Sequence, residues 1–417
     1  MKTIYTSIDI GSDTVKFIVS ELYKDKFNIL ASHTIKTKGI RKGLIVDANL
    51  VINTLKDGVK EINNNLGIEI KKAIVNVPSY NSKFIYTETS KEITSEDSKI
   101  TKEDINELIK KSVYSKIPND YELLTVQPLD FIIDSENKNP YPVGKTGKNI
   151  TLKAIIIATP KKNIYSVVSV MEASSIELTD ITISGLADYY EVKNDSTDKK
   201  VGAIINLGHE TTTVSIFNRG KIMNTETIQI GGRNIERDLA RVFNIDIFET
   251  RVLKEKFASA HKRFLSLTEV FEIKNTVGEV MKLSQLEVSE VVMARLSEIL
   301  ELAKKQILLL TKQKINYVIL TGGLTEIKHF KNLCFEIFGK DVIIYSVDTL
   351  GVRDNKYTTA LGMVKYFNDK MLVRGKNYTM IDSVDESLLI TPKNNNKKND
   401  KIITKIFGSF LSNSKED

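Results

Sequence analysis

The sequence has few of the residues that cross-link a chain or bind metal ions. It contains one cysteine, Cys334, no tryptophan and only seven prolines in 417 residues. A single cysteine excludes an internal disulfide, and the four histidines are too scattered to form a metal-ligand motif. Because free cysteines pack as small buried hydrophobes, we interpret Cys334 as a core residue and not as a nucleophile.

Long apolar runs are also missing. No stretch of about 18 apolar residues occurs, so no segment is expected to span a membrane. At the N-terminus, Asp9 stands where a signal peptide needs its apolar centre, and no small-residue cleavage site follows. We therefore expect a cytoplasmic protein.

The composition that remains is that of a globular protein with an excess of lysine. Hydrophobic residues make up 41% and charged residues 27% of a chain long enough for two or more units. The net charge of +7 suits an anionic membrane surface, although a lysine-rich solvated surface is the simpler explanation. Since the chain has no nucleic-acid motif and no basic stripe interleaved with aromatics, no nucleic-acid partner is expected.

The two halves of the chain repeat one plan. Residues 9–19 recur as residues 206–216, and in each copy an apolar strand enters a glycine-containing turn and an alternating second strand. A third short strand follows, and helices then alternate with single buried strands. This pattern predicts an α/β fold of two similar lobes.

Further elements follow from periodicity and turn signals. Helices are predicted over 48–66, 234–243 and 290–311, the last with Ser289 as its N-cap, and single strands over 72–77 and 317–320. Between the halves, residues 84–158 read as a small α+β subdomain with a helix near 101–115 and strands near 121–133 and 150–158.

Three glycine-bearing turns are candidates for a nucleotide site, because glycine lets the backbone approach a ligand closely. The first two turns suit the phosphates, and the third suits the adenosine part. Asp9 is expected to order water on Mg²⁺, and Lys16 to add positive charge near the phosphates. Taken singly, such turns are usually structural, so their order and spacing carry the prediction. The candidates in the three turns are Gly11, Ser12 and Asp13; Gly208, His209, Thr211 and Thr212; and Gly322 and Gly323.

The order of these motifs resembles the superfamily of actin, the heat-shock chaperones and the sugar kinases. Besides the three turns, it includes the connecting segment 183–187 and the closing segment 357–362. Within that superfamily the chain resembles the FtsA family of bacterial actin-like division proteins. The closer match rests on 139–147 in the insert, on 230–235, and on an amphipathic C-terminal segment.

The resemblance implies two duplicated ribonuclease-H-like domains that bind ATP and Mg²⁺ and polymerise into filaments. It also implies that the chain tethers filaments of the tubulin-like protein FtsZ to the cytoplasmic face of the membrane at the division site, with further division proteins as additional partners. Arg251 and Lys254 then lie where relatives approach the adenine, although a solvated helix face explains them equally well.

The predicted division of the chain follows the same resemblance. Lobe I comprises 1–83, 159–198 with the connecting helix, and 351–390, and the insert for filament contacts is 84–158. Lobe II comprises its phosphate hairpin 199–234, a small FtsZ-docking subdomain 235–305, and 306–350. A flexible linker 391–400 and a membrane-targeting helix 401–413 follow.

The second phosphate turn departs from the superfamily pattern. Asn206 stands in place of an aspartate that helps to hold the metal and the attacking water, and His209 and Glu210 stand in place of glycines. A neutral amide should weaken hydrolysis more than binding. We therefore expect ATP binding with slow or negligible turnover, and we expect Glu210 to repel phosphates unless it points away or faces the metal.

The C-terminal segment is amphipathic on a helical wheel. At about 100° per residue the large apolar side chains fill one half of the wheel and the polar residues fill the other. The apolar half holds Ile402, Ile403, Ile406, Phe407, Phe410 and Leu411, and Lys401 and Lys405 lie in the polar half. We interpret this segment as an interfacial membrane helix, with docking on the body or on a partner as the alternative.

Two other functions remain open at this point. A sugar or acyl kinase would need a catalytic aspartate beside its acceptor and has no use for the C-terminal segment. A scaffold of the pilus-assembly type would share the two lobes but lack the lipid-binding helix.

Overall fold

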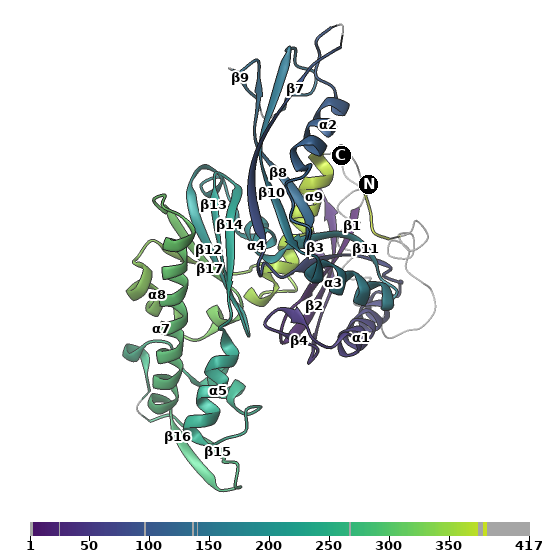
Figure 1. The fold of residues 1–417 in the computed structure, drawn as a ribbon. Helices are drawn as coiled ribbons and strands as arrows, with labels where there is room; N and C mark the ends of the chain where they lie inside the picture. Colours follow the sequence, from purple (N-terminus) through teal and green to yellow (C-terminus); the bar gives the residue numbers. More distant parts are fainter. Residues whose placement is uncertain are drawn as a thin grey trace, which may run out of the picture.

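The molecule consists of two α/β lobes with an added subdomain at each end. The computed structural model describes residues 3–381 except 25, 96, 136, 140, 267 and 374–377. Lobe I and lobe II lie side by side, the inserted subdomain rises above them, and a small subdomain extends below lobe II (Figure 1). The predicted linker and membrane helix lie outside the described residues.

Lobe I is built on a five-stranded sheet in the order β11-β6-β1-β2-β3. Its first three strands form an antiparallel meander, and β6 and β11 extend it in parallel. Helix α1 packs against β3 and α3. The elements are β1 (Thr3–Ile10), β2 (Thr14–Tyr23), β3 (Lys26–Lys36), β6 (Lys72–Val77), β11 (Glu177–Ile183), α1 (Ala48–Leu66) and α3 (Lys161–Ala173).

Lobe II repeats this topology with a sheet in the order β14-β13-β12-β17-β18. Again an antiparallel meander is extended by two parallel strands. The predicted duplication is therefore confirmed. The elements are β12 (Val201–Leu207), β13 (Thr212–Asn218), β14 (Lys221–Ile228), β17 (Tyr317–Thr321), β18 (Val342–Ile344), α7 (Gln285–Leu310) and α8 (Phe330–Phe338).

Two helices connect the lobes and cross closely. They are α4 (Ser184–Val192) and α9 (Thr358–Val373). Gly362 of α9 lies so near the backbone of α4 that an added Cβ would stand 1.8 Å from the carbonyl oxygen of Ala187. Only glycine permits this approach.

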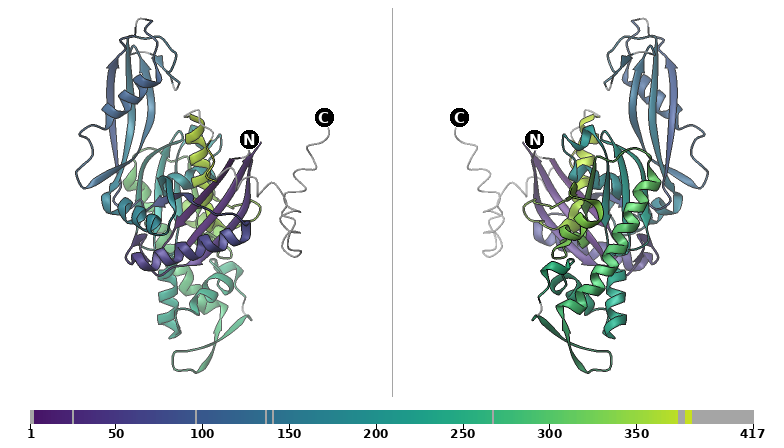
Figure 2. Two further views of the ribbon diagram at one scale, coloured as in Figure 1. Left: turned by 90° about the vertical axis from the view of Figure 1, so that its right-hand side faces the viewer. Right: turned by 90° about the vertical axis from the view of Figure 1, so that its left-hand side faces the viewer.

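The inserted subdomain is an antiparallel sheet in the order β7-β10-β8-β9, with one helix packed on it. Its elements are β7 (Lys83–Glu92), α2 (Lys102–Val113), β8 (Tyr121–Ile133), β9 (Asn137–Lys138) and β10 (Asn149–Pro160). Thr101 and Asp104 form a capping box that begins α2. The subdomain projects away from the lobes as a tall, narrow layer (Figure 2).

The small subdomain combines α5 (Gly232–Phe243), α6 (Thr250–Val252) and a hairpin of β15 (Val270–Lys274) and β16 (Val280–Ser284) with the start of α7. Here one sequence prediction is wrong. The N-cap of α7 is Ser284, which forms a capping box with Glu287. Ser289 is fully buried inside the helix, where its Oγ accepts a hydrogen bond from the Ser259 backbone N–H.

Cys334 is buried in the core of lobe II, as the sequence predicted. Across residues 3–381, apart from the gaps, no helix is both long enough and apolar enough to span a membrane.

Candidate functional site

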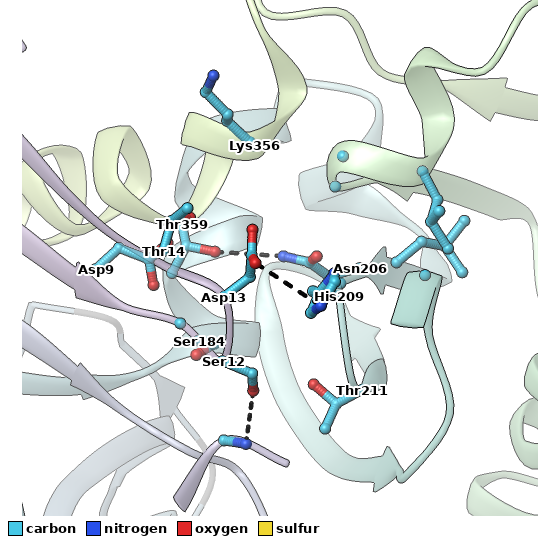
Figure 3. A pocket seen from close by; sticks show the side chains of 18 of the residues that line it. Asp9, Ser12, Asp13, Thr14, Ser184, Asn206, His209, Thr211, Lys356 and Thr359 are labelled. Carbon is cyan, nitrogen blue, oxygen red and sulfur yellow. Dashed lines mark hydrogen bonds and ion pairs between the residues drawn. The ribbon is translucent and has the colours of Figure 1, made fainter. Parts of the chain in front are cut away.

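The two repeated turns face each other across the cleft between the lobes. The turn of lobe I follows β1, the turn of lobe II follows β12, and both line one cavity of about 520 Å³ (Figure 3). Ligand pockets typically measure roughly 300–1,000 Å³. The cavity is therefore large enough for a nucleotide.

Each turn needs glycine because the backbone closes on itself. Gly11 N–H donates to the Thr14 carbonyl over 3.2 Å, and Gly208 N–H donates to the Thr211 carbonyl over 2.9 Å. A Cβ on either glycine would stand 2.9 Å from that carbonyl oxygen. The same constraint therefore shapes both copies of the repeat.

The third turn, at the end of β17, also depends on glycine. Gly322 has a φ of +94°, and a Cβ there would lie 2.5 Å from Oδ1 of Asn206. Backbone in this region is strained for residues with side chains. Gly322 thus brings the third turn against the second one.

On the lobe I side, Lys16 and Asp9 form a buried ion pair. Lys16 Nζ lies 2.8 Å from Asp9 Oδ2, and Asn76 donates its side-chain N–H to Asp9 Oδ1 over 2.9 Å. An ammonium group has three hydrogens, so Lys16 keeps donors for a phosphate oxygen. The carboxylate holds the lysine at the wall of the cavity.

On the lobe II side, a buried carboxylate organises several cations. Glu236 of α5 is 1% exposed, and Lys254 Nζ lies 2.7 Å and Arg233 Nη1 3.2 Å from its oxygens. Burial alone would raise the pKa of Glu236, but Lys254, the largest opposing influence, and Arg251 hold that pKa below its usual value. Glu236 therefore stays ionised and positions the cations around it.

A π-helical turn over Leu253–Phe257 brings two of these cations into the cleft. Such turns are rare and are frequent at functional sites. Lys254 lines the cavity, as does Arg251 just before the turn. Arg251 reaches across the cleft, and its Nη2 lies 2.8 Å from Oδ1 of Asp13 in lobe I.

Asn206 is held by a buried acid behind it. Its side-chain N–H donates to Asp188 Oδ2 over 2.8 Å, and Thr359 donates to the other carboxylate oxygen over 2.6 Å. Burial raises the pKa of Asp188 to about 7, although the hydrogen bonds from Thr359 and Asn206 oppose this. Position 206 thus has an amide in place of the expected carboxyl group, and the nearby carboxyl group of Asp188 lies behind that amide.

Glu210 points away from the cavity and joins the lobes. It accepts a hydrogen bond of 2.6 Å from the backbone N–H of Lys42, at the tip of a hairpin of β4 (Ile40–Arg41) and β5 (Leu44–Ile45). The Lys42 side chain donates to Gln229 of lobe II over 2.8 Å. Glu210 is therefore turned away from the space where phosphates would lie.

Thr212 is the one predicted cofactor residue that does not reach the cavity. It is fully buried, and its hydroxyl donates to the Ile230 carbonyl over 2.9 Å. Because side chains alternate along β13, Thr211 and Thr213 line the cavity while Thr212 faces the core.

Two family models match the chain. One, described as the SHS2 domain inserted in FtsA, matches residues 82–158, and the other, described as cell division protein FtsA, matches residues 203–362. The chain belongs to the FtsA family.

Known members of the FtsA family align with most of the chain. Cell division protein FtsA of Bacillus subtilis is 26% identical over 377 residues, which cover 89% of this chain and 85% of the relative. FtsA of Enterococcus hirae is 25% identical over 87% of this chain and 83% of its own length. The chain is therefore a cell-division protein by family.

Solved structures share its actin-like fold. The PilM-PilN type IV pilus biogenesis complex matches with a TM-score of 0.60 at 12% identity, over 86% of this chain and 97% of that chain. MreB5 of Spiroplasma citri bound to ADP matches with a TM-score of 0.56 at 13% identity, over 90% and 99%. The expected two-lobed fold with an inserted subdomain is confirmed.

Most of the cofactor residues predicted for this FtsA-family chain meet at one cavity. It is lined by Asp9, Gly11, Ser12, Asp13, Lys16, Asn206, Gly208, His209, Thr211, Arg251, Lys254, Gly322 and Gly323. Sequence reasoning missed Glu236 and Asp188. Asp188 directly follows the connecting segment that was singled out, whereas nothing in the sequence marked Glu236.

The donor set of the cavity suits the phosphates better than it suits a protein-bound metal. In the part of the chain that the structure describes, no group of three or more histidine, cysteine, aspartate or glutamate side chains could hold a metal ion. The role of Asp9 in binding Mg²⁺ through water therefore stays a prediction, in line with the few carboxylates and several waters with which proteins commonly bind this ion.

Proposed function

We propose that this FtsA-family chain binds ATP between its lobes, polymerises, and tethers FtsZ filaments to the cytoplasmic face of the membrane at the division site. The observation that carries the ATP proposal is the cavity, where two glycine turns from opposite lobes meet Lys16, Arg251 and Lys254. Backbone donors and cations on both sides suit a polyphosphate. The residues named above would hold the nucleotide, and Mg²⁺ bound with it would neutralise phosphate charge.

The nucleotide class is supported by the fold. MreB5 of Spiroplasma citri was solved with ADP and with AMPPNP. The family resemblance implies that Arg251 and Lys254 lie where relatives approach the adenine, and their positive charge at the cavity wall would also favour the neighbouring phosphates.

The membrane and FtsZ parts of the proposal rest on the family and on the amphipathic 401–413 segment. The insert would supply contacts between neighbours in a filament, and the small subdomain would dock FtsZ.

A recruitment assay tests the tethering proposal. Vesicles with anionic lipid are sedimented with FtsZ filaments and ATP, with and without this chain. We expect FtsZ in the vesicle pellet only when the chain is present, because FtsZ then has a membrane-bound partner. Equal amounts of FtsZ in both pellets would contradict the tether.

The hydrolysis rate is expected to be limited by Asn206. The wild-type chain should release phosphate far more slowly than kinases, which turn over at about 1–100 s⁻¹. The variant Asn206→Asp places a carboxyl against Asp188 and should lower the free energy of unfolding by about 2–4 kcal/mol.

The double variant N206D/D188N exchanges the two groups and is the matched control. It restores an amide-to-carboxyl hydrogen bond with the acid facing the cavity, so stability should recover. Phosphate release should rise by roughly tenfold or more. Kinase-like rates in the wild type, or no gain in a stable double variant, would refute the role given to Asn206.

A further inference from the structure

His209 occupies a position in the second turn that its repeat partner fills with Ser12. The backbone of this turn is fixed, because the carbonyls of Gly208 and His209 accept hydrogen bonds from the first two N–H groups of α5, over 3.0 and 2.6 Å. The imidazole is therefore the part of the residue that can adjust to a ligand. It lies in the cleft beside Asp13 of the opposite lobe (Figure 3).

Two carboxylates and two cations face the imidazole. His209 Nε2 lies 3.8 Å from Asp13 Oδ1 and 3.8 Å from Glu236 Oε2. Both distances exceed hydrogen-bond length. Each carboxylate also has a shorter ion pair, Asp13 with Arg251 at 2.8 Å and Glu236 with Lys254 at 2.7 Å.

Burial and these neighbours together favour the neutral form of the ring in the free protein. Burial is the largest effect and lowers the pKa of His209; Asp13 and Glu236 raise it, while Lys254 and Arg251 lower it further. The side chain is 16% exposed, so it retains access to the cavity. A polyphosphate in the cavity would add negative charge next to this ring.

We propose that His209 contacts the phosphate chain of the bound nucleotide and becomes protonated on binding. The proton comes from solvent, and imidazolium then donates a charge-assisted hydrogen bond to a phosphate oxygen. The inference rests on the proposed ATP site. It adds a side-chain contact to the phosphates that the glycine expected at position 209 in the superfamily could not make. It also gives the cleft an additional cation only when a nucleotide is bound.

The coupling between proton uptake and ATP binding fixes the direction in which the affinity changes with pH. Binding raises the pKa of His209 above its value in the free protein, so the extra affinity is fully present below the free-state pKa. It is lost as pH rises through the bound-state pKa. The dissociation constant should therefore increase with pH, by at most about tenfold per unit within that window.

Titration calorimetry measures the proton uptake on ATP binding directly. MgATP is titrated into the full chain at pH 7 in buffers of different ionisation enthalpy, and the slope of observed enthalpy against that quantity counts protons. We expect uptake of part of one proton by the wild type, after correction for the nucleotide alone. His209→Gln keeps a polar side chain but cannot become charged, and it should bind ATP more weakly without that uptake.

His261→Gln is the matched control. His261 also pairs with a carboxylate, with Nε2 3.0 Å from Glu336 Oε1, but it does not line the cavity. This variant should keep wild-type uptake and affinity. ATP binding without proton uptake in the wild type, or with equal uptake in H209Q, overturns the inference alone. No ATP binding by the folded wild type overturns the nucleotide proposal as well.

Discussion

Replacing Lys16 by methionine should lower the affinity for ATP by about 100-fold or more. Lys16 is the only cation on the lobe I side that is both buried and fixed by a carboxylate among the described cavity residues. Methionine keeps the length of the side chain but offers no charge to the phosphates. Affinity is measured by calorimetry or with a fluorescent ATP analogue.

The same change also affects stability, because it leaves Asp9 with Asn76 as its remaining partner in the buried network. Breaking a buried ion pair from one side costs about 3–5 kcal/mol. The double variant K16M/D9N removes both charges and separates the two effects. It should recover most of the stability but not the ATP affinity, and wild-type affinity in a folded K16M chain would contradict the role of Lys16.

A chain that ends at Thr391 should lose vesicle binding while the body stays folded. The removed segment carries six large apolar side chains on one half of the helical wheel. Partial burial of each in the interface is worth roughly 1–2 kcal/mol. Sedimentation with anionic vesicles measures binding, and thermal unfolding checks the body.

A matched pair of point variants tests the face of the helix. Phe407→Glu and Ser409→Glu change the net charge equally, but Phe407 lies in the apolar half of the wheel and Ser409 in the polar half. We expect F407E to abolish vesicle binding and S409E to reduce it only slightly. Equal binding by the truncated and full-length chains would refute the membrane role.

The sequence predicted the glycine turns and the two lobes better than the ion pairs around Glu236. Each repeated turn lies directly after an apolar strand, so local signals were enough to locate Gly11 and Gly208 and the two lobes. The partners of Glu236 come from α5 and from a π-helical turn, and no local sequence pattern predicts that turn. Pairings of this kind depend on how separate elements pack.

Three further misses have physical causes. The sequence offers both Ser284 and Ser289 near the start of α7, and the structure uses Ser284 because Glu287 completes its capping box. Thr212 shares its residue type with Thr211, and only the alternation along β13 separates a cavity residue from a core residue. Asp188 was overlooked because a buried acid behind an amide has no sequence signature.

The close crossing of α4 and α9 makes the two connections between the lobes a single pivot. Beside the backbone contact at Gly362, ion pairs join Glu191 to Lys365 over 2.9 Å and Lys193 to Asp369 over 2.8 Å, so the two helices would turn as one unit. A rotation displaces atoms in proportion to their distance from its axis. The inserted subdomain and the hairpin of β15 and β16 lie at opposite ends of the molecule (Figure 1), so they are the tips of two long lever arms.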